Sequence, residues 1–306
     1  MTLVDSDWDD LLRSIKNKKC TPFIGAGASA PWIPLGGELA RTWAEEYGYP
    51  LEDCCALDRV AQFLAVKYDD DLHPKLLLSR SLERIRIPDL SLEQYRKSPY
   101  AVLADLHLPA YITTNYDKIM EYTLRMKGKD PVTEFCRWNN YARAAGISSP
   151  FDKKEGYVPS QHNPLVYHLH GVFDIPQSMV LSEKDYIDFM INLSSKDEGD
   201  ILPPPVRTAM VSTTLLFIGY SLSDVNFRLI FRGIINSLGK GLMLKNIAVL
   251  LPPRISQDKE LDDSSEARAI DYLNRYVKDM FKVHVYWGAA SQFSRDLHER
   301  WSQFGK

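Results

Sequence analysis

Cysteine is scarce in this chain of 306 residues, and it never occurs in the paired spacing that structural zinc sites use. The four cysteines are Cys20, Cys54, Cys55 and Cys136. No C-x-x-C pair occurs among them, so neither a zinc module nor a disulfide framework is expected. We predict that the protein binds no metal and that its thiols stay reduced inside the cell.

A surplus of one charge and long apolar runs are also missing. The formal net charge is −3, which argues against a dedicated nucleic-acid-binding protein, so no direct contact with nucleic acid is expected. The N-terminal residues include early acidic side chains and no apolar signal core, and no stretch approaches the ~20 apolar residues of a membrane span. We therefore expect a soluble, cytoplasmic protein that does not associate with membranes.

Short apolar runs alternate with helical patterns along most of the sequence. We predict strands at 22–24, 111–114, 165–169, 215–218, 247–251 and 282–287, with Gly219 ending the fourth. Helices are expected at 7–17, 39–47, from about 117, at 182–193, from 203, at 223–238, 267–280 and 291–304. Residues 128–163 read as a long connection with one short strand, and residues 257–265 as a charged loop.

This alternation predicts an α/β fold with a doubly wound, mostly parallel, Rossmann-like sheet. Apolar residues at helical spacing between about 50 and 98 indicate a helical insertion that forms a smaller lobe. The whole chain, 1–306, is read as one domain that contains this insertion. Ligands of such sheets bind outside the carboxyl ends of the strands, where four short motifs are predicted.

The first motif is Gly25-Ala-Gly-Ala-Ser-Ala30, which fits the G-x-G-x-x-G/A pattern of phosphate-binding turns. Its small residues would let the backbone approach a pyrophosphate, and the following helix would offer N–H groups. A tight turn between strand and helix is the alternative. No acidic residue stands at the strand end where hydride-transfer enzymes hold a ribose, because Glu45 and Glu46 fall within the next predicted helix.

The second and third motifs carry candidate catalytic side chains. In Thr113-Thr-Asn-Tyr-Asp117, Asn115 can hold a ribose hydroxyl or a water, while Asp117 can act electrostatically or simply cap the next helix. In His168-Leu-His-Gly171, we expect the two histidines to face opposite sides. His170 would then open into the cleft as a base, and His168 would be structural.

The fourth motif, Gly219-Tyr-Ser221, is a second glycine turn that could contact a phosphate or ribose. In this order, the four motifs resemble those of the sirtuin family. The resemblance implies that Gly25, Ala26, Gly27 and Ser29 hold the pyrophosphate of NAD, with Thr114 also in contact with the nucleotide. It also implies that Asn115 and Asp117 flank the nicotinamide ribose, that His170 is the general base, and that Gly219 and Ser221 contact the adenosine side.

The sequence departs from protein-deacylating sirtuins because residues 172–218 contain no cysteine, whereas those enzymes have two C-x-x-C pairs there. It is more similar to the zinc-less sirtuin-like proteins of bacterial antiphage defence, which hydrolyse NAD⁺. That resemblance implies a separate partner, such as a HerA-type ATPase or an Argonaute-like sensor. Because NAD⁺ hydrolysis without control would poison the cell, we also expect a homo-oligomer whose assembly gates the activity. Two alternatives stay open: an NAD-dependent protein deacylase or ADP-ribosyltransferase, and a non-catalytic module that binds NAD or ADP-ribose.

Overall fold

The computed structural model describes residues 3–30, 32–90, 92–152, 156–194, 201–221, 245–252, 263–281 and 283–304. Its centre is a parallel sheet of seven strands in the order β3-β4-β2-β1-β5-β6-β7. The strands are β1 (Cys20–Ile24), β2 (Ala110–Thr113), β3 (Val132–Phe135), β4 (Leu165–His168), β5 (Thr214–Tyr220), β6 (Asn246–Leu250) and β7 (Val283–Trp287). The predicted α/β class and the six predicted apolar strands are confirmed.

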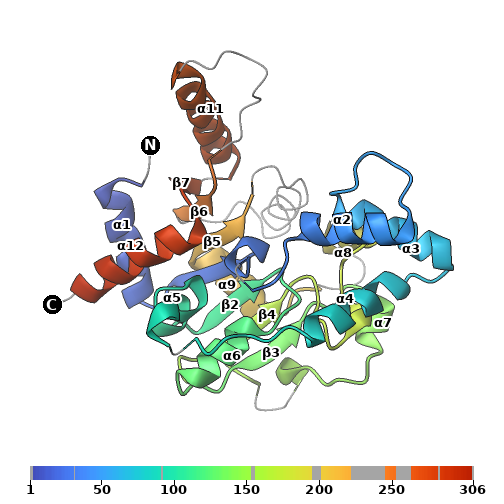
Figure 1. The fold of residues 1–306 in the computed structure, drawn as a ribbon. Helices are drawn as coiled ribbons and strands as arrows, with labels where there is room; N and C mark the ends of the chain where they lie inside the picture. The colour runs from blue at the N-terminus through green and yellow to red at the C-terminus, as the bar shows by residue number, and fades with distance from the viewer. Residues whose placement is uncertain are drawn as a thin grey trace.

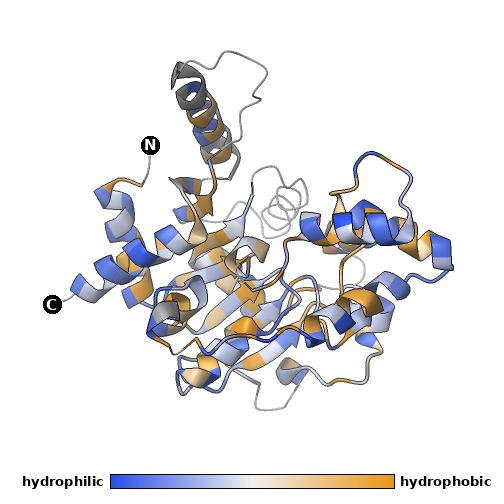
Figure 2. Cartoon of the chain, viewed as in Figure 1, coloured by the Kyte–Doolittle hydropathy of each residue, from blue (hydrophilic) through white to orange (hydrophobic). Residues whose placement is uncertain are grey.

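Helices cover both faces of the sheet (Figure 1). One face packs against α1 (Asp5–Lys16), α5 (Pro99–Asp105), α6 (Ile119–Met126) and α12 (Ala290–Gln303). The other packs against α8 (Glu183–Ser194), α9 (Pro204–Ser212) and α11 (Asp263–Phe281). Figure 2 shows apolar residues concentrated on the central strands, as expected for strands that are buried on both faces.

A separate apolar cluster forms the core of the helical lobe. It joins α2 (Gly36–Tyr47), α3 (Leu57–Tyr68) and α4 (His73–Glu83) to Met179 and Leu181, which precede α8. The lobe lies beside the carboxyl end of the sheet in Figure 1. Its helices therefore include α2, which precedes the predicted insertion. The described residues between 84 and 98 contain only the single turn η2 (Glu93–Tyr95).

The lobe is also tied to α8 by polar contacts. Lys75 of α4 and Asp185 of α8 form a buried ion pair with a distance of 2.7 Å, and Asp185 also accepts the N–H of Ser182. The Ser182 hydroxyl oxygen in turn accepts the N–H of Asp185, which completes a capping box at the start of this helix. The same carboxylate therefore begins α8 and anchors the lobe.

Several predicted boundaries are wrong. Gly219 does not end the fourth predicted strand, because β5 continues to Tyr220 through an irregularity in its pairing with β6. The first motif does not run into a long helix either. It forms the single turn η1 (Ala26–Ala28), and α2 starts only at Gly36. In addition, α11 begins at Asp263, inside the stretch expected to be a charged loop.

The connection between β2 and β4 contains the expected short strand, β3, followed by α7 (Asn140–Arg143) and η3 (Pro150–Asp152), with η4 (Pro176–Ser178) after β4. The helix predicted at 223–238 lies outside the described residues. Within the described parts of the chain, no helix has the length and apolar character needed to cross a membrane.

The strand order reverses between β1 and β5, so the loops that follow these two strands meet there. Gly25 donates its N–H to Ile218 at 2.9 Å, and Gly219 adopts φ +86° directly against the first motif. A Cβ on Gly219 would lie 2.5 Å from both the Ala28 nitrogen and the Gly25 oxygen. The two glycine motifs therefore pack backbone against backbone at the switch point of the sheet.

We expect Gly219→Ala to destabilise the fold by at least about 3 kcal/mol, because left-handed strain and overpacking add together. Gly48→Ala is the matched control, since Gly48 has φ +69° but no atom within 4 Å of the added Cβ. Its cost should stay near 1–2 kcal/mol, roughly the strain alone. Urea unfolding of both variants measures the difference, and equal costs would contradict the close packing.

Candidate active site

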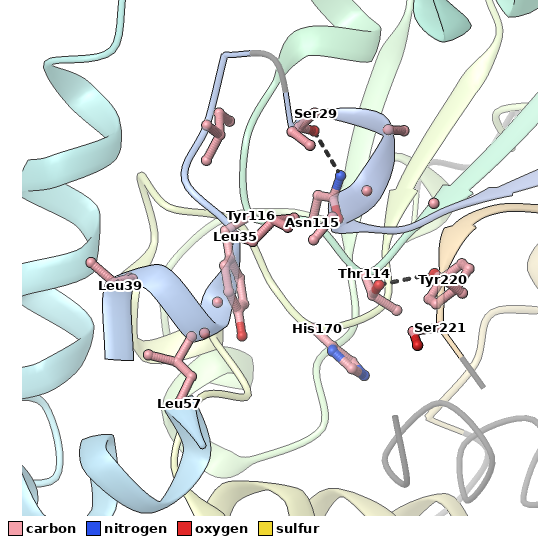
Figure 3. A pocket seen from close by; sticks show the side chains of 18 of the residues that line it. Ser29, Leu35, Leu39, Leu57, Thr114, Asn115, Tyr116, His170, Tyr220 and Ser221 are labelled. Carbon is pink, nitrogen blue, oxygen red and sulfur yellow. Dashed lines mark hydrogen bonds between the residues drawn. The ribbon is translucent and has the colours of Figure 1, made fainter. Parts of the chain in front are cut away.

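All four motifs reach one cleft of about 1370 Å³ at the carboxyl end of the sheet. Figure 3 shows Ser29, Thr114, Asn115, His170 and Ser221 around this opening. Nine of the predicted site residues line it: Ala26, Gly27, Ser29, Thr114, Asn115, Asp117, His170, Gly219 and Ser221. Gly25 lies beneath them, where its backbone packs on Ile218 and Gly219.

Asn115 is held through both its backbone and its side chain. Its N–H donates to the Thr113 hydroxyl at 2.9 Å, and its carbonyl oxygen lies 2.9 Å from Nδ1 of His168. Its side-chain nitrogen donates to the Ser29 hydroxyl at 3.0 Å and to the Tyr100 hydroxyl at 3.1 Å. Contacts from β2, β4, α5 and the loop after β1 therefore fix one residue at the cleft wall.

Asp117 is both a capping residue and part of this polar cluster. One carboxylate oxygen accepts the N–H of Ile119, the first residue of α6, at 3.0 Å, which is the capping role that the sequence suggested. The other oxygen accepts the hydroxyl hydrogen of Ser29 at 3.2 Å. Burial raises the pKa of Asp117 to about 6, so its charge responds to pH near neutrality.

The two histidines are placed as expected, but strand alternation does not explain their placement. Residues two apart in a regular strand share a face. Here β4 ends at His168 and the chain turns through Gly171, which has φ +83°, so the rings separate. His168 turns toward Glu121 of α6, whereas His170 packs against α8 and lines the cleft.

His168 and Glu121 form a fully buried pair with 2.8 Å between Nε2 and Oε1. Burial opposes charge on both groups, but their mutual attraction outweighs it. The pKa of His168 is therefore raised and that of Glu121 is lowered. The other ring nitrogen of His168, Nδ1, faces the carbonyl oxygen of Asn115. Because a carbonyl oxygen can only accept, Nδ1 carries a hydrogen and donates it there. His168 is thus a structural residue that supports Asn115.

His170 has the opposite environment. Its ring makes edge contacts with Tyr186 and Phe189 of α8, with centroid distances of 5.4 Å. Burial lowers the pKa of His170 to about 3, so the imidazole is neutral at physiological pH. Its Nε2 is buried and has no hydrogen-bond partner within the described part of the chain. His170 is thus in the unprotonated state that a general base requires, with one ring nitrogen unused.

A scan of family models identifies residues 109–273, more than half of the chain, as a SIR2-like domain. The chain belongs to the SIR2-like domain family. Its relatives among curated proteins include NAD(+) hydrolase ThsA of Acinetobacter baumannii (strain 532279), 25% identical over 223 residues. ThsA proteins of Cytobacillus dafuensis and Bacillus cereus (strain MSX-D12) are 24% and 25% identical over 217 and 226 residues.

These alignments cover 70–71% of this SIR2-like chain but only 38–40% of the relatives. The chain therefore spans about two fifths of the length of the curated proteins it matches. The matched family agrees with the resemblance carried by the four motifs.

The thiols do not fit the metal module of zinc-containing sirtuins. Cys20 lies buried in β1, Cys136 lies buried just after β3, and Cys54 and Cys55 lie in the helical lobe. Burial raises the pKa of Cys20 and of Cys136 to about 12, which disfavours the thiolate that would bind zinc. No cluster of three or more His, Cys, Asp or Glu side chains suited to a metal occurs among the described residues.

Sequence patterns assign no role to three polar residues that organise the site: Tyr100, Glu121 and Tyr220. The Tyr220 hydroxyl donates to the Ile24 carbonyl at 3.0 Å and lies 2.9 Å from the Thr114 hydroxyl, so it connects β5, β1 and β2 (Figure 3). Tyr220 stands inside the fourth motif, which was the one signal for it. Tyr100 and Glu121 belong to ordinary helical patterns that give no indication of their contacts.

Replacing His168 with alanine should destabilise the SIR2-like domain by about 3–5 kcal/mol, because Glu121 would remain buried without its partner. Lys184→Ala is the control, since the Lys184–Asp71 pair is exposed on the lobe side of α8 and should cost about 0–1 kcal/mol. Denaturant unfolding of the two variants tests this. A cost below about 1 kcal/mol for His168→Ala would contradict the role given to the buried pair.

Proposed function

We propose that this SIR2-like chain hydrolyses NAD⁺ to nicotinamide and ADP-ribose, as an effector that depletes NAD⁺ in antiphage defence. The observation that carries the proposal is that Asn115 and a neutral His170 line one cleft at the switch point of a parallel sheet. The relatives, all named as NAD(+) hydrolases, support the same activity.

The nucleotide would lie across the loops that follow β1 and β5. The backbone of Gly25, Ala26 and Gly27 suits a pyrophosphate, because glycine and alanine leave room for close approach. Gly219 and Ser221 would contact the adenosine side, and Thr114 would lie between the two ends. The hydroxyl of Ser29 is bonded to Tyr100, Asp117 and Asn115, so a contact from Ser29 to the pyrophosphate would come from its backbone.

In the reaction, the bond between ribose C1′ and the nicotinamide nitrogen breaks, and its electron pair neutralises the pyridinium ring. Because that ring leaves readily, the protein needs no strong general acid. The ribose passes through a state resembling an oxocarbenium ion, and a water oxygen then bonds to C1′. Asn115 would position that water or a ribose hydroxyl, His170 would accept the released proton, and Asp117 would hold Ser29 and the start of α6 in place.

Nicotinamide release in the presence and absence of an acetylated peptide tests the activity itself. Release without peptide, with one ADP-ribose for each nicotinamide, supports hydrolysis. Release only with peptide would replace the proposal with a deacylase or ADP-ribosyltransferase. If the protein releases no nicotinamide, either alone or with a partner protein, the chain would instead be a module that binds the nucleotide without cleaving it.

His170→Ala and Asn115→Ala should each reduce nicotinamide release by roughly 10²–10⁴-fold, the usual contribution of a positioned acid–base group. Both side chains lie at a cleft wall, so the variants should remain folded by circular dichroism. His162→Ala is a matched control, because His162 is exposed on a surface loop and away from the cleft lining. Full activity in His170→Ala would rule out its role as base.

We also propose that the chain is a homo-oligomer that docks onto a partner protein of the HerA-type ATPase or Argonaute class. A hydrolase of NAD⁺ without control would poison its own cell, and association is a direct way to gate a cleft. The insertion at 50–98, within the single domain proposed for 1–306, is the candidate contact. Its α3 exposes Val66 and Tyr68, with 72% and 44% of their surface accessible.

Light scattering should therefore give a mass of at least two chains, and Val66→Asp should reduce it. Turnover should rise when the partner is added. A monomer that turns over fully without a partner would contradict the proposed assembly.

A further inference from the structure

A tyrosine outside the four motifs stands directly behind Asn115. Tyr100 lies in the first turn of α5, which begins with Pro99 after a Ser98 cap, and its side chain is 1% exposed. Its hydroxyl is 2.6 Å from the Ser29 hydroxyl and 3.1 Å from the side-chain nitrogen of Asn115. Of these three residues, Ser29 and Asn115 line the cleft and Tyr100 does not.

The hydrogens in this group can be assigned one by one. The Asn115 side-chain nitrogen lies within hydrogen-bonding distance of both the Ser29 and Tyr100 oxygens, which are close enough to each other to share one amide hydrogen. Ser29 has one hydroxyl hydrogen, which goes to the Asp117 carboxylate. The Tyr100 hydrogen must then go to Ser29, since the two hydroxyls are 2.6 Å apart and Ser29 has no second hydrogen to give.

This arrangement fixes which way the Asn115 amide points. In the reverse orientation the amide oxygen would face the Ser29 oxygen, whose hydrogen is already donated to Asp117. One hydrogen bond would be lost and two oxygens would face each other in a buried place, where an unmet polar contact is costly. The amide nitrogen therefore points to Ser29 and Tyr100, and Oδ1 is left as an acceptor for the cleft.

We propose that Tyr100 is a positioning residue for the cleavage of NAD⁺: together with Ser29, it holds the Asn115 amide in the orientation that leaves Oδ1 as an acceptor for the cleft. That acceptor would take a hydrogen from a ribose hydroxyl or from the attacking water. The proposal rests on the proposed function for its role in the reaction, while the orientation of the amide rests on the contacts alone.

Another buried tyrosine, Tyr111, provides a comparison, because its hydroxyl has a purely structural hydrogen bond. Tyr111 in β2 is 0% exposed, and its hydroxyl donates to the Leu103 carbonyl at 3.1 Å, in the ordinary manner of a core tyrosine. The Tyr100 hydroxyl instead forms hydrogen bonds with two side chains of the site, those of Ser29 and Asn115. The two residues provide a matched pair, because replacement by phenylalanine removes one buried hydroxyl in each case and keeps the ring.

We expect Tyr100→Phe to lower kcat by roughly 10–100-fold, because loss of alignment of a reacting group costs up to about 10² in rate. KM for NAD⁺ should change little, since Tyr100 does not contact the nucleotide. Tyr111→Phe and Tyr100→Phe should lower the melting temperature by similar amounts. Tyr111→Phe should nevertheless leave kcat unchanged. Equal kcat values for the two variants would overturn the proposal.

A second comparison separates positioning from a general loss of structure. If Tyr100 and Ser29 both act through Asn115, the Ser29→Ala/Tyr100→Phe double variant should be no slower than the slower single variant, within about threefold. Rate losses that multiply would mean that the two residues act independently, which contradicts the shared role.

The orientation can be measured even if the proposed function fails. In protein labelled with ¹⁵N-asparagine, the side-chain resonance of Asn115, assigned by its absence from Asn115→Ala, should shift in Tyr100→Phe and stay in place in Tyr111→Phe. An unshifted resonance in Tyr100→Phe would overturn the proposal whatever the activity. If the resonance shifts in Tyr100→Phe but the wild-type protein releases no nicotinamide from NAD⁺, alone or with a partner, the proposed function is rejected and the contact between Tyr100 and Asn115 is retained.

Discussion

The rest of the cleft depends on the hydrogen bonds that immobilise Asn115. This residue lies where the chain leaves β2, and backbone in such a loop is free to move unless other elements hold it. Here the carbonyl is held from β4 by His168, the N–H by Thr113 of β2 and the side chain by Ser29 and Tyr100. Each of these partners is itself buried. The polar wall of the cleft is therefore part of the folded core, and its geometry is set before any ligand arrives.

The topology supplies the place for that wall. In a parallel sheet all strands end at the same edge, so residues after β1, β2, β4 and β5 become neighbours although they are far apart in the chain. The reversal of strand order between β1 and β5 brings Gly25 and Gly219 into backbone contact. The helical lobe is fixed to α8 by the buried Lys75–Asp185 pair, and α8 carries the aromatic rings that keep His170 neutral.

Sequence patterns could predict much of this fold because buried parallel strands are short apolar runs, and six of the seven were found in that way. Asn115 and His170 could be placed together because each follows such a run. The partners of Asn115 could not be predicted, since Tyr100 and Glu121 lie on helices whose spacing indicates only an apolar face. The separation of His168 from His170 depends on where β4 ends, and strand periodicity does not show that point. Gly219 was read as a strand end because glycine usually interrupts strands, whereas here it permits close packing within one.

A crystal structure of the His170→Ala variant soaked with NAD⁺ tests the central claim most directly, because the slowed variant would retain the intact nucleotide. We expect the pyrophosphate along the backbone of residues 25–27 and the nicotinamide ribose within hydrogen-bonding distance of Asn115 Oδ1. The Asn115 side-chain nitrogen should still point to Ser29 and Tyr100. A nucleotide bound elsewhere, or a ribose that meets the Asn115 nitrogen, would contradict that claim.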